Sequence, residues 1–271
     1  MTIRVRAPAT TANLGPAFDC AAVALDLWNE LEVGEGDDEP DERHLGVRAF
    51  AQLAPTDGRT FAFTDRIPRE RGLGSSAAVV ALGLAAGALA SERDLDPEEL
   101  LAAGLPLEGH ADNLAAALAG GVCLTWSGRI ARVADSVPAV PLAVVPEATV
   151  STEAARAALP AQVPHTDAAF TAARAAVLGA ALASGSEELF AAALDDRLHE
   201  PYRAANAPLL AAVRARLPAG ALGATVSGSG PTVIVWAREA EAKACVEELA
   251  GRHPDAQILP LAVATTGAGV A

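Results

Sequence analysis

The chain opens with apolar residues at alternate positions, Ile3 and Val5, each followed by an arginine. This period of two predicts a half-buried β-strand. Residues 7–19 are rich in turn-forming residues and predict a loop, after which residues 21–33 read as a second strand. Residues 34–46 are acidic and polar with few apolar positions, so we expect an exposed connection there.

The rest of the chain alternates between helix-like and strand-like segments. Asp96, Pro97 and the glutamates after them are typical of a helix start, and we expect that helix to be interrupted near Gly104–Pro106. Residues 166–184 place apolar side chains at a helical period and end before Gly185. Further helices are predicted at 47–53, 77–90, from Ser186 to near Pro201, at 206–217 and at 239–251, and strands at 61–63, 122–126, 141–145, 224–226, 232–236 and 257–263.

The short apolar strand at 141–145 is a plausible boundary between two domains, residues 1–140 and residues 141–271. The second half combines several helices with a few short strands, which predicts an α+β domain with a small antiparallel sheet.

Residues 67–76 form the segment with the clearest candidate chemistry. Pro68 ends the preceding structure, Gly72 and Gly74 permit a tight turn, and Ser75 and Ser76 stand where the helix over 77–90 would begin. The unpaired N–H groups and the positive end of the helix dipole would then face the loop and attract an anion such as phosphate. The alternative is an ordinary glycine turn with a serine N-cap.

The composition limits the partners of the protein. The 271 residues carry a net charge of −14 and a single lysine, Lys243. This balance disfavours binding to nucleic acid or to an anionic membrane surface, so an anionic substrate needs arginines, helix N-termini or a divalent metal. No signal-peptide pattern and no apolar run long enough to span a bilayer is found, and Cys20, Cys123 and Cys245 suit a reducing compartment. We therefore expect a cytoplasmic location.

A second group of polar residues lies at 108–113. Glu108, His110, Asp112 and Asn113 are four side chains able to hold a metal or move a proton, or else a structural polar cluster at a helix start. No Gly-Lys-Ser/Thr of a Walker A loop occurs. We expect His199 to be a hydrogen-bonded structural histidine rather than a ligand.

Three glycine- or proline-punctuated loops occur at 13–19, 68–76 and 227–231. With their flanking residues, 8–19, 68–78 and 226–232, they resemble the three motifs of the GHMP kinase superfamily. Within it the chain resembles the homoserine kinase family. The specific points are Asn13-Leu14-Gly15-Pro16 with Phe18-Asp19, Glu108-Gly109-His110 with Asp112-Asn113, Ser151-Thr152 with Arg156, and Asp196-Arg197-Leu198-His199 with Pro201-Tyr202-Arg203. Ala17 and Ser229 depart from the usual glycine and alanine, and the region 34–46 is short for the family.

The resemblance implies an α+β, two-domain GHMP kinase fold. Residues 1–140 would form the nucleotide-binding domain, which is similar to domain 2 of ribosomal protein S5, and residues 141–271 a ferredoxin-like domain. The implied activity is ATP-dependent phosphorylation of the L-homoserine hydroxyl to O-phospho-L-homoserine in threonine biosynthesis. The alternatives are another small-molecule kinase of the superfamily, acting on mevalonate or a sugar, and an inactive sensor of nucleotide or amino acid. Family members are often dimers, so a homodimer is possible.

The resemblance also implies roles for individual residues. Arg156 and Arg203 would hold the substrate carboxylate, and Asp19, assisted by Asn13, the ammonium group. His110 and Asn113 would lie near the reacting hydroxyl, while Asp112 is either a general base or, as we favour, a positioning group. Thr152 joins the substrate site, Mg²⁺ would be bound by Ser76 and Glu108, and the nucleotide by Pro68, Arg69, Glu70, Arg71, Gly72, Leu73, Gly74, Ser75 and Ser76.

Overall fold

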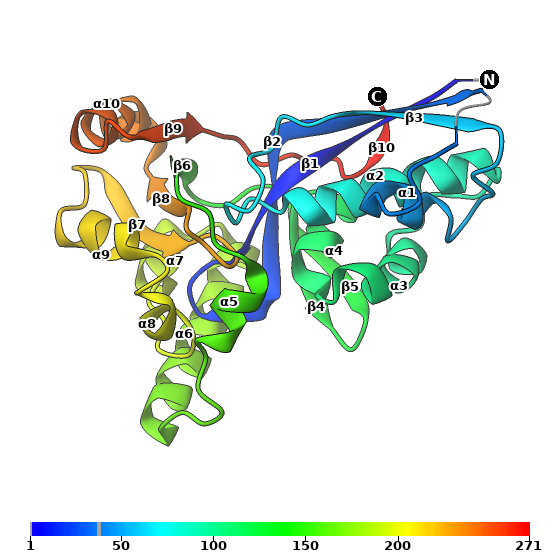
Figure 1. Cartoon of the computed structure of the whole chain (residues 1–271). Coiled ribbons are helices and arrows are strands. Elements are labelled where there is room, and N and C mark those ends of the chain that lie inside the picture. Colours follow the sequence, from blue (N-terminus) through cyan, green and yellow to red (C-terminus); the bar gives the residue numbers. More distant parts are fainter. Residues whose placement is uncertain (1, 37–38) are drawn as a thin grey trace.

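The computed structural model describes residues 2–36 and 39–271 and contains two antiparallel sheets, each covered by helices (Figure 1). The first sheet has the order β10-β1-β2-β4-β5, with β3 also paired to β2. Its strands are β1 (Ile3–Asn13), β2 (Ala17–Glu35), β3 (Arg59–Thr64), β4 (Val122–Trp126), β5 (Arg129–Ala134) and β10 (Gly269–Val270).

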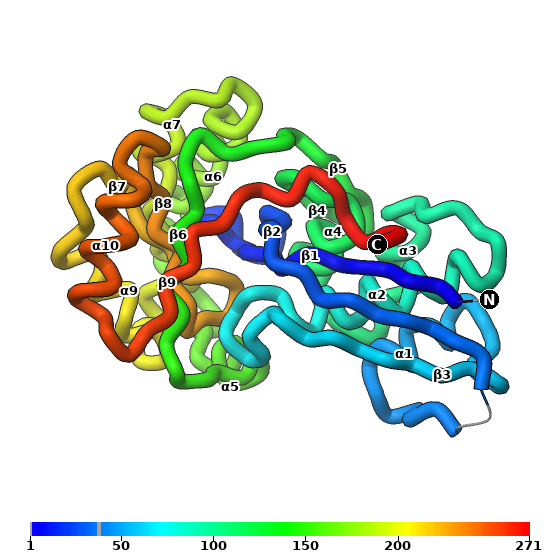
Figure 2. Tube along the Cα trace, turned by 90° about the horizontal axis from the view of Figure 1, so that it is seen from above, coloured from blue at the N-terminus to red at the C-terminus, as the bar shows by residue number. Residues whose placement is uncertain are grey.

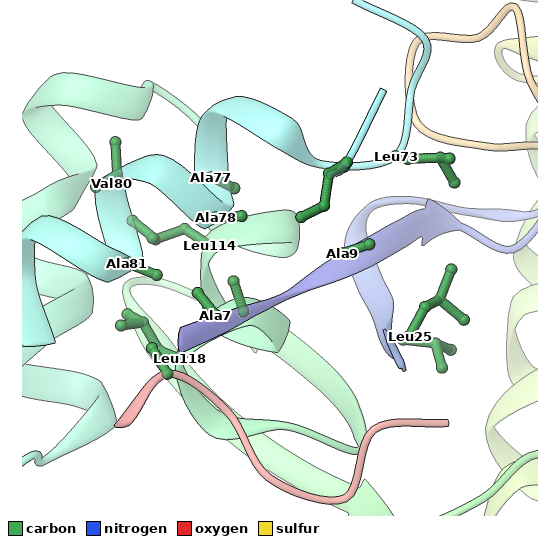
Figure 3. Packing of buried hydrophobic residues seen from close by; sticks show 14 of the residues in the cluster. Ala7, Ala9, Leu25, Leu73, Ala77, Ala78, Val80, Ala81, Leu114 and Leu118 are labelled. Carbon is green, nitrogen blue, oxygen red and sulfur yellow. The ribbon is translucent and has the colours of Figure 1, made fainter. Parts of the chain in front are cut away.

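Four helices pack on one face of this sheet: α1 (Leu45–Phe50), α2 (Ser75–Ala90), α3 (Pro97–Glu108) and α4 (Ala111–Ala119). Every residue from Ala77 to Ala88 of helix α2 is buried, which suits their small, apolar side chains. Figure 3 shows Ala77, Ala78 and Ala81 of α2 beside the alanines of β1 and Leu114 of α4. These small side chains let α2 approach the sheet closely and place its N-terminus at the end of β1.

The second sheet has the order β7-β8-β6-β9, and the β-α-β-β-α-β succession is the ferredoxin-like one that the resemblance implies. Its strands are β6 (Val140–Pro146), β7 (Ala221–Val226), β8 (Val233–Ala237) and β9 (Ala256–Pro260). Its helices are α5 (Thr152–Ala157), α6 (His165–Ser184), α7 (Glu187–Ala193), α8 (Glu200–Arg203), α9 (Pro208–Ala215) and, after a short 3₁₀ turn at Glu239–Glu241, α10 (Ala242–Arg252).

The end of the chain returns to the first sheet (Figure 2). After β9, the N–H of Asp26 in β2 donates to the carbonyl of Ala262, and β10 pairs with β1 at Val5 and Arg6. Residues 261–271 therefore join the two sheets, although they follow the second sheet in sequence. The division at residue 140 remains a prediction, and it falls where β6 begins.

The loop predicted over residues 7–19 is wrong for most of its length. Strand β1 continues to Asn13, and β2 begins at Ala17. Ala9 and Ala12 are fully buried, and the ladder shifts register between Pro8 and Ala9, a bulge of the kind that accommodates proline within a strand. Pairing with β2 thus overrides the turn-forming composition. Of the exposed connection predicted over 34–46, residues 37 and 38 lie outside the described part of the chain.

The predicted interruption of the Asp96 helix is also wrong. Asp96 is the N-cap, as expected, but α3 runs without a break through Gly104 and Pro106 to Glu108. Pro106 stands two residues before the helix end, so its missing N–H removes only one hydrogen bond. Gly104 lies where a Cβ would approach Leu114 to 2.8 Å, so it serves close packing and not a break.

The helix predicted from Ser186 to near Pro201 divides in two. Helix α7 ends at Ala193, and the carboxylate of Asp196 then accepts hydrogen bonds from the backbone N–H groups of Leu198, His199 and Glu200. A side chain that accepts from these groups replaces the helical pattern by a tight turn. The other predicted helices and strands are confirmed within a few residues. The segments β5, α4, α5 and β10 were not predicted. Within the described residues, no helix is long and apolar enough to cross a membrane.

The contact between α1 and α2 generates a stability prediction. A Cβ at Gly83 of α2 would lie 2.1 Å from the carbonyl oxygen of Gly46, whereas a Cβ at Gly179 of α6 would meet nothing within 4 Å. We expect Gly83→Ala to lower the free energy of unfolding by about 1–3 kcal/mol through overpacking. Gly179→Ala, the matched control, should raise it by about 0.5–1 kcal/mol. Urea unfolding measures both, and equal effects of the two substitutions would contradict this packing.

Candidate active site

A polar cavity of about 260 Å³ lies where the phosphate-loop candidate, the β1–β2 turn and the second domain meet. Most of the predicted site residues line it. The lining residues are Asn13, Asp19, Glu70, Gly72, Gly74, Ser75, Ser76, Glu108, His110, Asp112, Asn113, Val150, Ser151, Thr152, Arg156, Arg203, Gly228 and Ser229.

The phosphate-loop candidate has the backbone that its glycines predict. Gly72 and Gly74 have φ values of 79° and 66°, a left-handed region that other residues adopt at a cost. A Cβ at Gly72 would lie 2.2 Å from the carbonyl oxygen of Ser227, so the loop rests directly on the Ser227–Gly230 turn. Gly74 is the N-cap of α2 and no side chain caps the helix, so the serine-cap alternative is wrong. The first N–H groups of α2 are therefore free for an anion.

Four of the predicted nucleotide-binding residues lie outside the cavity lining. Leu73 is fully buried, and its carbonyl accepts from the N–H of Thr10. Arg69 pairs with Asp65, while Arg71 donates to the carbonyls of Pro146 and Glu147 and, with Pro68, lines a neighbouring cavity. Their side chains shape and anchor the loop from outside.

The side chains of Ser76 and Glu108 are in contact at the N-terminal end of α2. The Ser76 hydroxyl donates to Oε2 of Glu108 at 2.6 Å. Burial raises the pKa of the Glu108 carboxyl to about 7, a shift that the Ser76 hydrogen bond opposes. In residues 2–36 and 39–271, no three His, Cys, Asp or Glu side chains form a metal-binding group. A hydroxyl and one carboxylate are hard oxygen ligands that suit Mg²⁺, which keeps several waters and binds phosphate oxygens.

The start of α4 brings Asp112 and Asn113 to the cavity. Asp112 is only 3% exposed, and this burial raises the pKa of its carboxyl. Its Oδ1 accepts from the backbone N–H of Asn113 at 2.7 Å, and His110 is the N-cap of the helix. The hydroxyl of Thr10 donates to Oδ1 of Asn113 at 2.7 Å.

Asp19 and Arg156, which the resemblance assigns to different ends of one substrate, form a two-bonded ion pair. Nη1 and Nη2 of Arg156 donate to the carboxylate of Asp19 at 3.0 and 2.6 Å. Asn13 accepts from the N–H of Asp19 and donates to the carbonyl of Gly228. Asn13 therefore holds Asp19 in place at the edge of the cavity.

Arg203 is buried but retains unused donors. Its Nη1 donates to the carbonyl of Gly228 at 2.9 Å, and burial lowers the pKa of the guanidinium. No atom of the described residues accepts a hydrogen bond from Nε of Arg203 or from Nε of Arg156. Phe18 lies beside both guanidinium groups, at 5.0 and 5.6 Å from its ring centre. Buried unpaired donors next to a cavity point to an anionic ligand.

His199 is a structural histidine, as expected. Nε2 lies 2.7 Å from the carbonyl oxygen of Gly15 and must carry the proton, so Nδ1 accepts from Nη1 of Arg203 at 3.3 Å. Burial lowers the pKa of His199 to about 4, against the opposing charge of Asp196. The neutral imidazole of His199 thus holds the Arg203 guanidinium through this hydrogen bond.

Several residues at this site had no role assigned from the sequence. Thr10 lies in the stretch interpreted as a loop, and Val150, Ser151, Gly228 and Ser229 line the cavity through folding of distant segments. The alternation of apolar residues continues through Ala7 and Ala9, and this signal predicts that Thr10 lies in a strand. The other contacts depend on how the two domains meet.

Two family models match this chain. The model of the GHMP kinases N terminal domain matches residues 44–121, and that of the GHMP kinases C terminal domain matches residues 167–255. The chain belongs to the GHMP kinase family.

Within that family its relatives are homoserine kinases. The chain is 40% identical to the homoserine kinase of Streptomyces coelicolor, over 97% of this chain and 96% of the relative, and 41% identical to that of Gloeobacter violaceus, over 93% of each. The crystal structure of homoserine kinase from Cytophaga hutchinsonii superposes with a TM-score of 0.88 at 25% identity, covering 100% of this chain and 97% of that one. Mevalonate kinase of Methanococcus jannaschii, at 15% identity and a TM-score of 0.72, shares the fold.

The buried neutral state of His199 predicts a pH dependence of stability. Between pH 6.5 and about 4 the unfolded chain binds a proton at this residue that the folded chain does not. The free energy of unfolding should therefore fall as the pH is lowered through this window. In His199→Gln the slope of the free energy of unfolding against pH should be smaller, by the equivalent of up to one bound proton. In His165→Gln, an exposed control, this slope should be unchanged. Urea unfolding at several pH values measures it, and an identical slope in His199→Gln would show that His199 titrates normally.

Proposed function

We propose that the chain is a homoserine kinase, which transfers the γ-phosphoryl group of ATP to the hydroxyl of L-homoserine. The observation that carries this proposal is one cavity that joins a helix N-terminus free of side-chain caps to two guanidinium groups with unpaired Nε donors and a carboxylate. The first part suits phosphates, and the second suits the carboxylate and ammonium of an amino acid. The relatives that match nearly the whole chain are homoserine kinases, and their name gives the same substrate.

The nucleotide phosphates are assigned to the backbone of Gly72–Ser76 and the first turn of α2. The left-handed glycines let the loop backbone approach an anion closely, and the helix dipole adds about half a positive charge at this end. This arrangement explains how a chain of net charge −14 with one lysine binds a polyanion. The predicted contacts of Pro68, Arg69, Arg71 and Leu73 are then limited to their backbone.

Mg²⁺ is proposed as the companion of ATP, held by Ser76 and Glu108. When bound, the ion neutralises charge on the transferring phosphates. Glu108 must then be ionised, and a nearby cation would favour the ionised form against the burial that raises its pKa. The hydrogen bond at 2.6 Å already brings the two oxygen ligands together.

The amino acid is assigned to the opposite side of the cavity. Arg203 and Arg156 both line the cavity, and a carboxylate accepts two parallel hydrogen bonds from a guanidinium edge. Asp19 offers the negative charge for the ammonium, and Thr152 also lines the cavity. Such a pairing of charges favours a zwitterion over mevalonate, which has no ammonium, and over an uncharged sugar.

The reacting hydroxyl is assigned to the corner formed by His110, Asp112 and Asn113. The O–P bond to ADP breaks as the bond to the homoserine oxygen forms, and the hydroxyl proton leaves to Oδ2 of Asp112 or to water. We favour positioning as the main contribution of Asp112, because the transition state of phosphoryl transfer is loose. The product, O-phospho-L-homoserine, belongs to threonine biosynthesis. A cytoplasmic location and a homodimer stay predictions.

A coupled assay of ADP release tests the proposed function. With ATP and Mg²⁺ we expect turnover with L-homoserine and little with mevalonate or galactose. Turnover confined to mevalonate or galactose would replace the substrate assignment, and binding without turnover would favour the sensor. Omitting Mg²⁺ in the presence of a chelator should abolish the activity.

Arg203 generates the second test. Arg203→Lys keeps the charge but loses the planar fork, so the KM for homoserine should rise about tenfold to a hundredfold, the equivalent of one or two hydrogen bonds to a charged group. The KM for ATP should stay within about twofold, because the hydrogen bonds of Arg203 go to His199 and Gly228 and not to the phosphate loop itself. Arg197→Lys is the matched control, since Arg197 is half exposed and pairs with Asp167. An unchanged KM for homoserine in Arg203→Lys would show that the carboxylate binds elsewhere.

A further inference from the structure

Thr10 links the two halves of the proposed reaction centre. Its side chain is fully buried at the end of β1, and its hydroxyl lies 2.7 Å from Oδ1 of Asn113. Its own N–H donates to the carbonyl of Leu73 in the phosphate loop. A Cβ at Gly74 would lie 1.9 Å from Oγ1 of Thr10, so the loop passes directly over this hydroxyl.

The orientation of the Asn113 carboxamide follows from its neighbours. Oδ1 of Asp112 accepts from the backbone N–H of Asn113 at 2.7 Å and is therefore an acceptor in either protonation state of the carboxyl. Nδ2 of Asn113 lies 3.3 Å from the same oxygen, which requires the NH₂ group on that side. Oδ1 of Asn113 must then face Thr10, and the Thr10 hydroxyl must be the donor.

This orientation limits what Asn113 can do. Its oxygen is turned toward Thr10, and one N–H is directed at Asp112, so the second N–H of Nδ2 is what the residue offers to a molecule in the cavity. Asn113 can donate to an oxygen there, but it cannot accept the hydroxyl proton of the substrate. A reversed carboxamide would place an oxygen against the Asp112 carboxyl oxygen and lose the donor.

We propose that Thr10 is a positioning residue for phosphoryl transfer: its hydroxyl holds the Asn113 carboxamide with Nδ2 toward the reacting oxygens, in register with the phosphate loop. This inference rests on the proposed function. It predicts an effect on the transfer step and not on binding of either substrate, because Thr10 is not part of the cavity lining.

Two substitutions separate the hydroxyl from the shape of the side chain. Thr10→Val keeps the volume and removes the donor, whereas Thr10→Ser keeps the donor. We expect Thr10→Val to lower kcat by about tenfold or more while both KM values stay within about twofold, and Thr10→Ser to retain at least about half of kcat. Thr225→Val is the matched control, since Thr225 is fully buried and accepts from Nε1 of Trp236. It should lower stability comparably and leave kcat unchanged.

A double-mutant cycle tests whether Thr10 acts through Asn113. If it does, Thr10→Val should have no further effect on kcat in an Asn113→Ala background. Full additivity of the two substitutions, or equal losses in Thr10→Val and Thr10→Ser, would overturn the proposal.

The side-chain ¹H–¹⁵N resonances of Asn113 give a readout that does not depend on activity. They should shift in Thr10→Val and remain near the wild-type position in Thr10→Ser and Thr225→Val. Unchanged resonances in Thr10→Val would overturn the inference even if the wild type phosphorylates homoserine. Conversely, if the wild type lacks turnover with homoserine but the Asn113 resonances still shift in Thr10→Val, the proposed function is refuted and the positioning contact remains in place.

Discussion

The contact between the phosphate loop and the Ser227–Gly230 turn is the constraint on which the rest of the structure depends. Gly72 approaches the carbonyl of Ser227 so closely that no side chain fits between them, and the Ser227 hydroxyl donates to the carbonyl of Gly72 at 2.6 Å. The same turn supplies the Gly228 carbonyl that receives Arg203 and Asn13. One backbone contact between the two domains therefore sets the position of the phosphate side and the amino-acid side of the cavity together.

The proposed function requires an acidic protein to bind anions in this cavity. The groups in it that can bind an anion are the backbone N–H groups at the start of α2 and two arginines, one of them buried against a neutral histidine. Nδ1 of His199 can accept from Arg203 only because the proton of the imidazole is on Nε2, which donates a hydrogen bond to the Gly15 carbonyl. Groups that attract anions are thus gathered at one place by the fold, while the chain as a whole carries a net charge of −14.

The fold and the relatives answer different questions. The GHMP kinase fold is shared with mevalonate kinase and does not by itself select a substrate. What distinguishes the proposed amino-acid site is the set of Asp19, Arg156 and Arg203, which lie at the start of β2, on α5 and on α8. These elements come from both domains, so substrate choice in this chain depends on the interface that the phosphate loop already requires.

The sequence by itself determined the elements whose pattern is strong and local: the glycine loop before α2, the Asp96 cap of α3 and the helical period of α6. Most of the lining residues were indicated by the resemblance of its motifs to those of the homoserine kinase family. The tertiary structure decided what composition alone misread. Residues 7–13 are a strand because β2 pairs with them, and the segment after Ala193 leaves the helix because Asp196 binds the next N–H groups. The role of Thr10 emerged only there, since its partners Leu73 and Asn113 are distant in sequence, and no local pattern specifies a contact that packing creates.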